Sequence, residues 1–251
     1  MIDFWSQCKP LKSFTGGKLI GLYGRGSSGK TTVSASFPNP VFIIFDDKGL
    51  NAIKADYPDI PYMDATGYSS QQLIELLDSI KNLPDDGVER TYVFSTFSVW
   101  IDNHPAQLMA EKRKAHMNQD LWAEHNARVN SVIAKCAELS QNGKRIILEF
   151  HERMSVLEGY EDELVPEVGV NAGPTIQKYL VGMLNYAFHT SIKQYTDPAS
   201  GKSYSCYAID INPLNAYYWI KGQGGADGLP PYIVVQKGEA FKALKQYYSE
   251  L

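Results

Sequence analysis

The sequence predicts an α/β fold, with a mostly parallel central sheet flanked by helices and an antiparallel extension near the C-terminus. Short apolar runs of strand length alternate with segments whose apolar residues recur at helical spacing, which indicates strand–helix–strand units. One of these runs leads at once into a glycine-rich loop and a helix-type segment. Apolar residues make up 44% of the 251 residues and charged residues 21%, so the chain can bury a sizeable core.

The expected elements follow one another without a long linker, an internal repeat or a low-complexity tract. Continuous apolar runs predict buried parallel strands, and Pro38 and Gly143 mark helix ends. The expected strands are 19–23, 41–45, 91–95, 145–150, 186–192 and 233–235. The expected helices are 32–37, 71–83, 105–140 in two pieces, 176–184 and 239–248, and segments 204–211 and 217–221 are expected to pair as a hairpin across 212–215. We therefore expect a single domain over 1–251, with an extension at 1–17, a core at 18–235 and a helical end at 236–251.

Charge and cysteine usage exclude several classes of protein. The formal net charge is −4, so the chain is not a general nucleic-acid coat, and any DNA binding must come from a local patch. No apolar run approaches the roughly 20 residues needed to span a bilayer, and residues 1–18 lack the apolar region of a signal peptide. The 3 cysteines are scattered and form no CxxC pair, which excludes a zinc or disulfide scaffold and predicts reduced thiols in the cytoplasm.

The strongest local signal is a phosphate-binding loop that follows the first expected strand. Residues 24–31 match GxxxxGK[ST] without a gap and lead directly into a helix-type segment. Glycines let successive N–H groups point at phosphate oxygens; Lys30 can reach the β- and γ-phosphates, and the Thr31 hydroxyl can hold Mg²⁺. The sequence therefore predicts that ATP and Mg²⁺ bind at Gly24, Arg25, Gly26, Ser27, Ser28, Gly29, Lys30, Thr31 and Thr32.

Polar residues at three strand ends give the sequence a family resemblance. Three apolar strands end in the segments Asp46-Asp47, Ser95-Thr96 and Glu149-Phe150-His151. Ligands of parallel sheets lie beyond the carboxyl ends of the strands. With the phosphate loop and the late Trp219-Ile220-Lys221, this order resembles the RecA-like ATPases. It is most similar to the phage-encoded RecA-core nucleotide-binding proteins associated with single-strand annealing. The resemblance spans roughly residues 14–235, and the phosphate loop is its most specific part.

The resemblance implies a role for several of these residues. Asp47 falls where the family places the acid that activates the attacking water, with Asp46 as the alternative. His151 falls at the position that senses the γ-phosphate. Thr31, Asp46 and Ser95 would face the magnesium ion. Ser95 departs from the family, which has an aspartate there, so either Asp46 or Asp102 compensates or hydrolysis is slow.

The resemblance also predicts DNA and subunit contacts. Loops at about 100–119 and 152–175 would line a path for single-stranded DNA, and the first contains the basic cluster Lys112, Arg113 and Lys114. A solvated helix face explains that cluster equally well. The second loop is acidic and is not expected to contact phosphates at its tip. Lys221 corresponds to a lysine that reaches the γ-phosphate of a neighbouring subunit in a ring or filament, although an edge-strand lysine is the plainer interpretation.

Three functions remain open from the sequence. The leading hypothesis is an ATPase that binds single-stranded DNA and supports phage recombination or annealing, in the host cytoplasm and with a single-strand-binding protein as a further partner. Ser95 favours a second reading, a nucleotide-gated assembly factor with little turnover. A nucleotide or small-molecule kinase is third, because the sequence shows no arginine-rich lid.

Overall fold

In the part of the chain that the structure describes, the fold is a nine-stranded mixed sheet with helices on both faces. The computed structural model describes residues 16–158, 164–196, 201–215, 218–222 and 227–251. The strands are β1 (Lys18–Gly24), β2 (Pro40–Ile44), β3 (Tyr62–Asp64), β4 (Thr91–Ser95), β5 (Arg145–Glu158), β6 (Leu164–Val170), β7 (Tyr186–Thr196), β8 (Ser203–Asp210) and β9 (Tyr232–Val234). The helices are α2 (Lys30–Ala35), α3 (Lys48–Asn51), α4 (Ser70–Lys81), α5 (Phe97–Lys112), α6 (Gln119–Gln141), α7 (Pro174–Met183) and α8 (Ala240–Lys245).

The predicted fold class is confirmed. The strand order is β3-β2-β4-β5-β1-β7-β8-β9, and the six strands from β3 to β7 run parallel. The antiparallel part consists of β8 on β7, β9 on β8, and β6 on β5. The carboxyl ends of β1, β2, β4 and β5 therefore meet at one edge of the sheet. This edge is where a ligand of such a fold binds.

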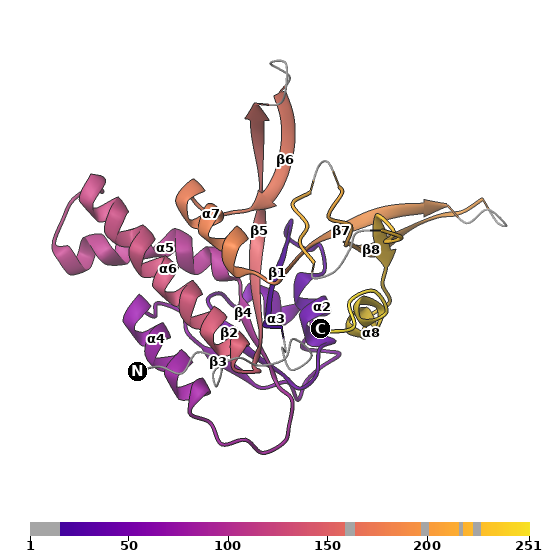
Figure 1. The fold of residues 1–251 in the computed structure, drawn as a ribbon, viewed down its shortest axis with the longest axis horizontal. Helices are drawn as coiled ribbons and strands as arrows, with labels where there is room; N and C mark the ends of the chain where they lie inside the picture. The colour runs from indigo at the N-terminus through magenta and orange to yellow at the C-terminus, as the bar shows by residue number, and fades with distance from the viewer. Residues whose placement is uncertain (1–15, 159–163, 197–200, 216–217, 223–226) are drawn as a thin grey trace, which may run out of the picture.

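Side-chain alternation along the strands divides the core between the two faces of the sheet. Leu19, Tyr92 and Ile146 belong to a core cluster that also contains buried residues of α4, α5, α6 and α7. Their neighbours, such as Ile20, Val93 and Ile147, belong to a second cluster that contains residues of α2 and α8. Figure 1 shows the two helical layers on opposite sides of the strands. Successive side chains of a strand point to opposite faces, so each strand contributes to both clusters.

The helices begin and end where local sequence stabilises them. The α4 helix has a capping box, in which the Ser69 hydroxyl accepts from the Gln72 N–H and the Gln72 side chain accepts from the Ser69 N–H. The Asn118 side chain caps α6 by accepting from the N–H of Leu121 at 2.9 Å. Within the described residues, no helix is both long enough and apolar enough to cross a membrane.

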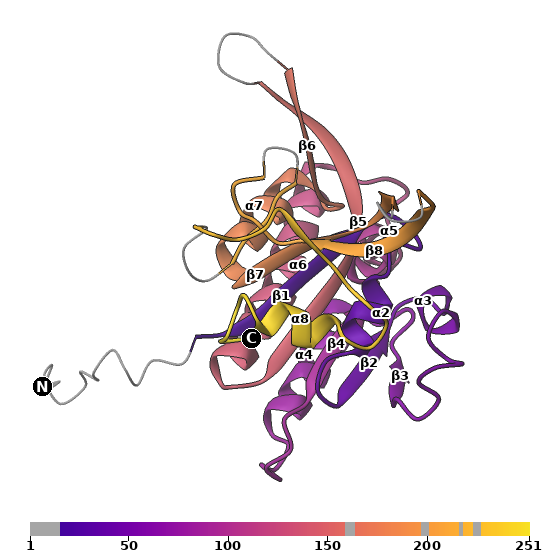
Figure 2. The ribbon, with the colours of Figure 1, turned by 90° about the vertical axis from the view of Figure 1, so that its right-hand side faces the viewer.

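Three local predictions were wrong. Most of the expected loop 100–119 is helix, because α5 starts two residues after β4 and extends to Lys112. The expected loop 152–175 is a β-hairpin, because β5 continues to Glu158 and pairs with β6; Figures 1 and 2 show this hairpin extending beyond the body of the sheet. The expected hairpin of 204–211 with 217–221 does not form among the described residues, which leave out residue 217: β8 pairs with β7 and β9, whereas Lys221 forms an isolated bridge to Ala187.

Candidate functional site

The phosphate loop connects the end of β1 to the start of α2. Its conformation requires left-handed backbone at Ser27, with φ 63°, and at Gly29, with φ 93°. A Cβ atom at Gly29 would lie 2.9 Å from Cδ1 of Tyr207, so a side chain there would be excluded by space as well as by φ. The Ser28 hydroxyl is within 2.7 Å of the Thr190 hydroxyl, which joins the loop to β7. The loop is thus held in shape by its own glycines and by the neighbouring strand.

The side chain of Lys30, the first residue of α2, folds back onto the phosphate loop. Its Nζ donates to the carbonyl oxygens of Gly24 at 2.9 Å and Arg25 at 2.8 Å, and only 7% of the residue is exposed. Burial lowers the pKa of Lys30, and the charges of Glu149, Glu152 and Asp46 oppose that shift. A triphosphate would exchange the two carbonyl contacts for phosphate oxygens, as the motif predicts.

A fully buried carboxylate, Glu149, lies beside the loop. Glu149 is on β5, and its Oε2 accepts from the Ser95 hydroxyl at 2.6 Å and from the Thr31 hydroxyl at 3.3 Å. Its Oε1 accepts from Ser34 at 2.5 Å. Burial raises the pKa of Glu149, while the hydroxyl groups and Lys30 act in the opposite direction. Of the three side chains predicted to face a metal, Thr31 and Ser95 are therefore both hydrogen-bonded to the Glu149 carboxylate.

His151 is level with the start of the loop, because it pairs with Gly24 in the register of β5 on β1. Its backbone N–H donates to the Ser98 hydroxyl at 3.0 Å, which ties β5 to the first turn of α5. Burial and then the charge of Lys30 lower the pKa of His151, while Asp46 and Asp102 oppose the shift. At pH 7 the imidazole is therefore mostly neutral, and it can both donate and accept a hydrogen bond.

The two aspartates after β2 differ in their surroundings. Asp46 is half-buried and close enough to Lys30 and His151 to affect the pKa of both. Asp47 is exposed and lines a separate cavity with Leu50 and Asn51. Of the two acids left open by the sequence, Asp46 is thus the one whose charge acts on Lys30 and His151. The Asp102 carboxylate accepts from Asn171 at 3.2 Å, and burial raises its pKa. Among the described residues the Ser95 hydroxyl donates to Glu149 and not to Asp102.

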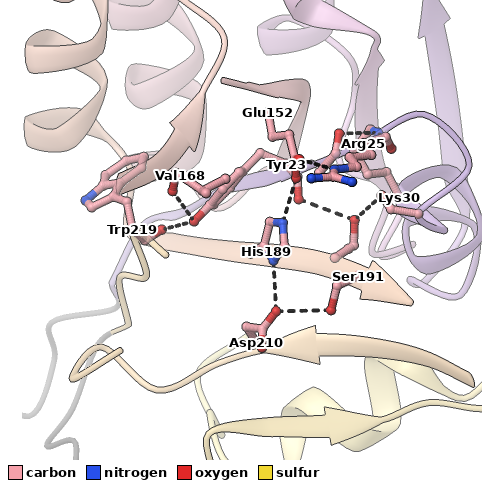
Figure 3. Close-up of polar contacts among 12 residues, drawn as sticks. Tyr23, Arg25, Lys30, Glu152, Val168, His189, Ser191, Asp210 and Trp219 are labelled. Carbon is pink, nitrogen blue, oxygen red and sulfur yellow. Dashed lines mark hydrogen bonds and ion pairs between the residues drawn. The ribbon is translucent and has the colours of Figure 1, made fainter. Parts of the chain in front are cut away.

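A chain of hydrogen-bonded ionisable side chains extends from the loop to β8 (Figure 3). Arg25 Nε donates to Glu152 at 2.7 Å, Glu152 is 2.9 Å from His189 Nε2, and His189 Nδ1 is 2.8 Å from Asp210. Tyr218 stacks on the His189 ring with the centroids 3.9 Å apart. This chain borders a cavity of about 560 Å³ beside the loop. It connects Arg25, which the sequence places in the phosphate loop, to the antiparallel end of the sheet.

Comparison with known families agrees with this geometry. A family model described as an AAA domain matches residues 17–209, which include the phosphate loop, β4, β5 and most of β8. The chain belongs to this AAA family. No curated protein matches the sequence. Family membership indicates an AAA-type P-loop ATPase domain that binds a nucleotide, typically with a divalent metal.

The AAA domain has oxygen donors that fit such a metal. Thr31 and Glu149 present hydroxyl and carboxylate oxygens, the ligand type that Mg²⁺ prefers. In the described part of the chain no cluster of three or more His, Cys, Asp or Glu side chains could hold a metal ion. Bound magnesium would therefore take its other ligands from water and from the phosphates of the nucleotide, which is its usual mode in nucleotide sites.

Two further residues of the predicted site in this AAA domain, Lys112 and Lys221, contact residues outside the phosphate loop. Lys112 ends α5 and pairs with Glu124 at 3.0 Å. Arg113 and Lys114 follow it and are exposed. Lys221 donates from Nζ to the carbonyl oxygen of Val181 at 2.7 Å, near the end of α7. The contacts of these residues with DNA and with a neighbouring subunit stay predictions.

Sequence reasoning assigned no role to Glu149, Glu152, His189 or Asp210. The position of Glu149 follows from the pairing of two strands and not from the local sequence. Strands β4 and β5 are adjacent, with Phe94 beside Leu148, so the next pair is Ser95 and Glu149 on the opposite face. His189 and Asp210 meet through the pairing of β7 with β8, and Glu152 reaches His189 because β5 and β7 flank β1. No local pattern predicts either arrangement.

Proposed function

We propose that this AAA domain is an ATP-hydrolysing protein that binds single-stranded DNA and supports recombination or annealing, as the RecA-like resemblance implies. The observation that supports it best is the link between the nucleotide site and two outward segments. His151 on β5 donates its N–H to Ser98 on α5, and α5 ends at the basic cluster. Asn171, just after β6, donates to Asp102 on α5 at 3.2 Å.

These bonds connect the nucleotide site to α5, which carries the basic cluster, and to the β5–β6 hairpin. Both strands that flank the predicted γ-phosphate site continue directly into α5 or into the β5–β6 hairpin. A shift at His151 would therefore move α5 and the hairpin together. The basic cluster is partly neutralised, since Lys112 pairs with Glu124, whereas Arg113 and Lys114 have no ion-pair partner among the described residues. Arg113 and Lys114 are then the cations available to a phosphate backbone.

ATP hydrolysis measured with and without single-stranded DNA tests the proposed function. Stimulation by DNA is the expected result. A second candidate, a nucleotide-gated assembly factor with little turnover, is favoured by the serine at position 95, and it predicts slow hydrolysis that DNA does not change. Transfer of phosphate to a small molecule in place of water would contradict both.

Replacing Lys112, Arg113 and Lys114 by Ala should weaken single-stranded DNA binding and flatten its salt dependence. Each lost phosphate contact should reduce the log–log slope by about 0.7. The double variant Arg113→Ala/Lys114→Ala should account for most of the change, because Lys112 is already paired with Glu124. Fluorescence titration over a range of salt concentrations measures the slope.

A matched control removes three cations elsewhere. Lys81, Lys242 and Lys245 are exposed, and Lys81 is paired with Glu138 at 2.6 Å much as Lys112 is paired with Glu124. Their triple Ala variant has the same net charge and should bind DNA like the wild type. Equal losses in the two triple variants would mean that only net charge matters and that the basic cluster is a solvated helix face.

The proposal includes self-association, with Lys221 reaching the nucleotide of a neighbouring subunit. For that role Lys221 must leave the carbonyl oxygen of Val181. Lys221→Ala and Lys30→Ala should each be inactive, yet a mixture should regain hydrolysis, because one subunit can lend Lys221 to the intact loop of another. Lys178→Ala, an exposed lysine on α7, is the control and should hydrolyse ATP normally. An active Lys221→Ala variant, or a mixture without recovery, would restrict Lys221 to its local bond.

A further inference from the structure

The strand that should carry the metal-facing acid of the site ends in Ser95, and the acid is one strand away. The Ser95 hydroxyl donates to Glu149 Oε2 at 2.6 Å, across the β4–β5 pairing. The same Oε2 accepts from Thr31 at 3.3 Å, and Thr31 is the residue of the loop that the motif assigns to the metal. One carboxylate oxygen thus lies between the two hydroxyl groups that the sequence placed at the metal.

A structural role alone does not account for Glu149, because burial of its carboxylate is energetically unfavourable. It is 0% exposed, and its direct partners are hydroxyl groups that supply no compensating charge. Burial of a carboxylate without an ion pair is strongly unfavourable, and such groups concentrate at functional sites. The nearest opposite charge that acts on it is Lys30 of the phosphate loop. Both observations connect Glu149 to the nucleotide rather than to the core.

Gly49 of α3 lies next to the hydroxyl groups of Thr31 and Ser95. The backbone of α3 covers the site at Gly49, where an added Cβ would lie 3.2 Å from the Thr31 hydroxyl and 3.3 Å from the Ser95 hydroxyl. A side chain at this position would press directly on both hydroxyl groups. Glycine at position 49 therefore avoids a close contact with the hydroxyl groups of Thr31 and Ser95.

We propose that Glu149 supplies the carboxylate that β4 lacks, so that the acid facing the metal of bound MgATP comes from the adjacent strand β5. Ser95 then orients Glu149 by donating its hydroxyl hydrogen. This inference rests on the proposed function, since it assumes that the loop binds ATP with magnesium. It replaces the two compensating acids considered from the sequence, Asp46 and Asp102.

The test compares ATP affinity with Mg²⁺ and with EDTA, using calorimetry on the full chain. In the wild type, Mg²⁺ should tighten ATP binding. In Glu149→Gln, that gain should fall at least tenfold, whereas affinity in EDTA should stay within about threefold of the wild type. The exchange variant Ser95→Asp/Glu149→Ser returns a carboxylate to the site from the other strand. It should recover most of the Mg²⁺ gain.

Stability separates this role from a structural one. If Glu149 faces a metal, Glu149→Gln removes a buried charge and should unfold at the same temperature as the wild type or higher. A lower unfolding temperature together with an unchanged Mg²⁺ gain would make Glu149 a structural residue and overturn the inference. If the wild type binds no ATP, the proposed function fails first. If it binds MgATP and Glu149→Gln keeps the full gain, only the role of Glu149 fails.

Discussion

Lys30→Ala is expected to weaken ATP binding at least tenfold, which corresponds to about 1.4 kcal/mol. Lys30 Nζ donates to the carbonyl oxygens of Gly24 and Arg25, the first two residues of the phosphate loop. Its removal takes away the main positive charge that can face the β- and γ-phosphates. Isothermal titration calorimetry with ATP measures the change, and circular dichroism establishes that the variant is folded.

The control for this variant is Lys54→Ala, which removes an exposed lysine that follows α3. Its ATP affinity should match that of the wild type. A second comparison uses pH. Because the pKa of Lys30 is lowered, chiefly by burial, ATP affinity in the wild type should begin to fall at a lower alkaline pH than an ordinary lysine would allow. A folded Lys30→Ala variant that binds ATP as tightly as the wild type would refute the phosphate-loop assignment.

The parallel part of the fold was predictable because its signals are local. Buried parallel strands read as continuous apolar runs, so β1, β2, β4 and β7 begin within one residue of where the sequence places them. The three-residue strand β3 was not predicted, because Tyr62 and Asp64 are exposed and form no apolar run. The partner of β8 was also missed. Pairing among β7, β8 and β9 is a choice between distant segments, and turn residues such as those at 212–215 do not decide it.

The site likewise has one part that local sequence predicts and another that depends on strand pairing. The phosphate loop is contiguous in sequence, and its chemistry depends on the order of a few residues. The metal-facing acid instead depends on which strand lies beside β4 and on the register between them. The sequence of β4 alone shows only that Ser95 stands where a charged residue is expected. The structure shows that the neighbouring strand β5 places the Glu149 carboxylate beside Ser95. Asp46 and Asp47 are distinguished only by which of them faces Lys30.

Asp210→Asn is expected to have the largest effect on stability, reducing the free energy of unfolding by roughly 3–5 kcal/mol. The Asp210 side chain is 2% exposed and faces His189 Nδ1 at 2.8 Å and Lys193 Nζ at 3.1 Å. Asparagine keeps the shape but removes the charge that both partners face. Urea unfolding at pH 7 measures the difference. Asp86→Asn, in an exposed pair with Arg90, is the matched control and should leave the free energy of unfolding nearly unchanged.

The pH dependence of this loss has a definite sign. Burial alone would raise the pKa of Asp210, but the hydrogen bond from His189 and the charge of Lys193 outweigh it, so the pKa lies below its ordinary 3.8. Its stabilisation is therefore fully present above pH 3.8 and is lost as the pH falls through the lower folded value. The difference between the wild type and Asp210→Asn should accordingly become smaller in acid, because protonated Asp210 no longer carries the charge. A difference that persists unchanged in acid would show that the substitution acts through packing. Because His189 also contacts Glu152, which holds Arg25 of the phosphate loop, ATP binding in Asp210→Asn should weaken as well.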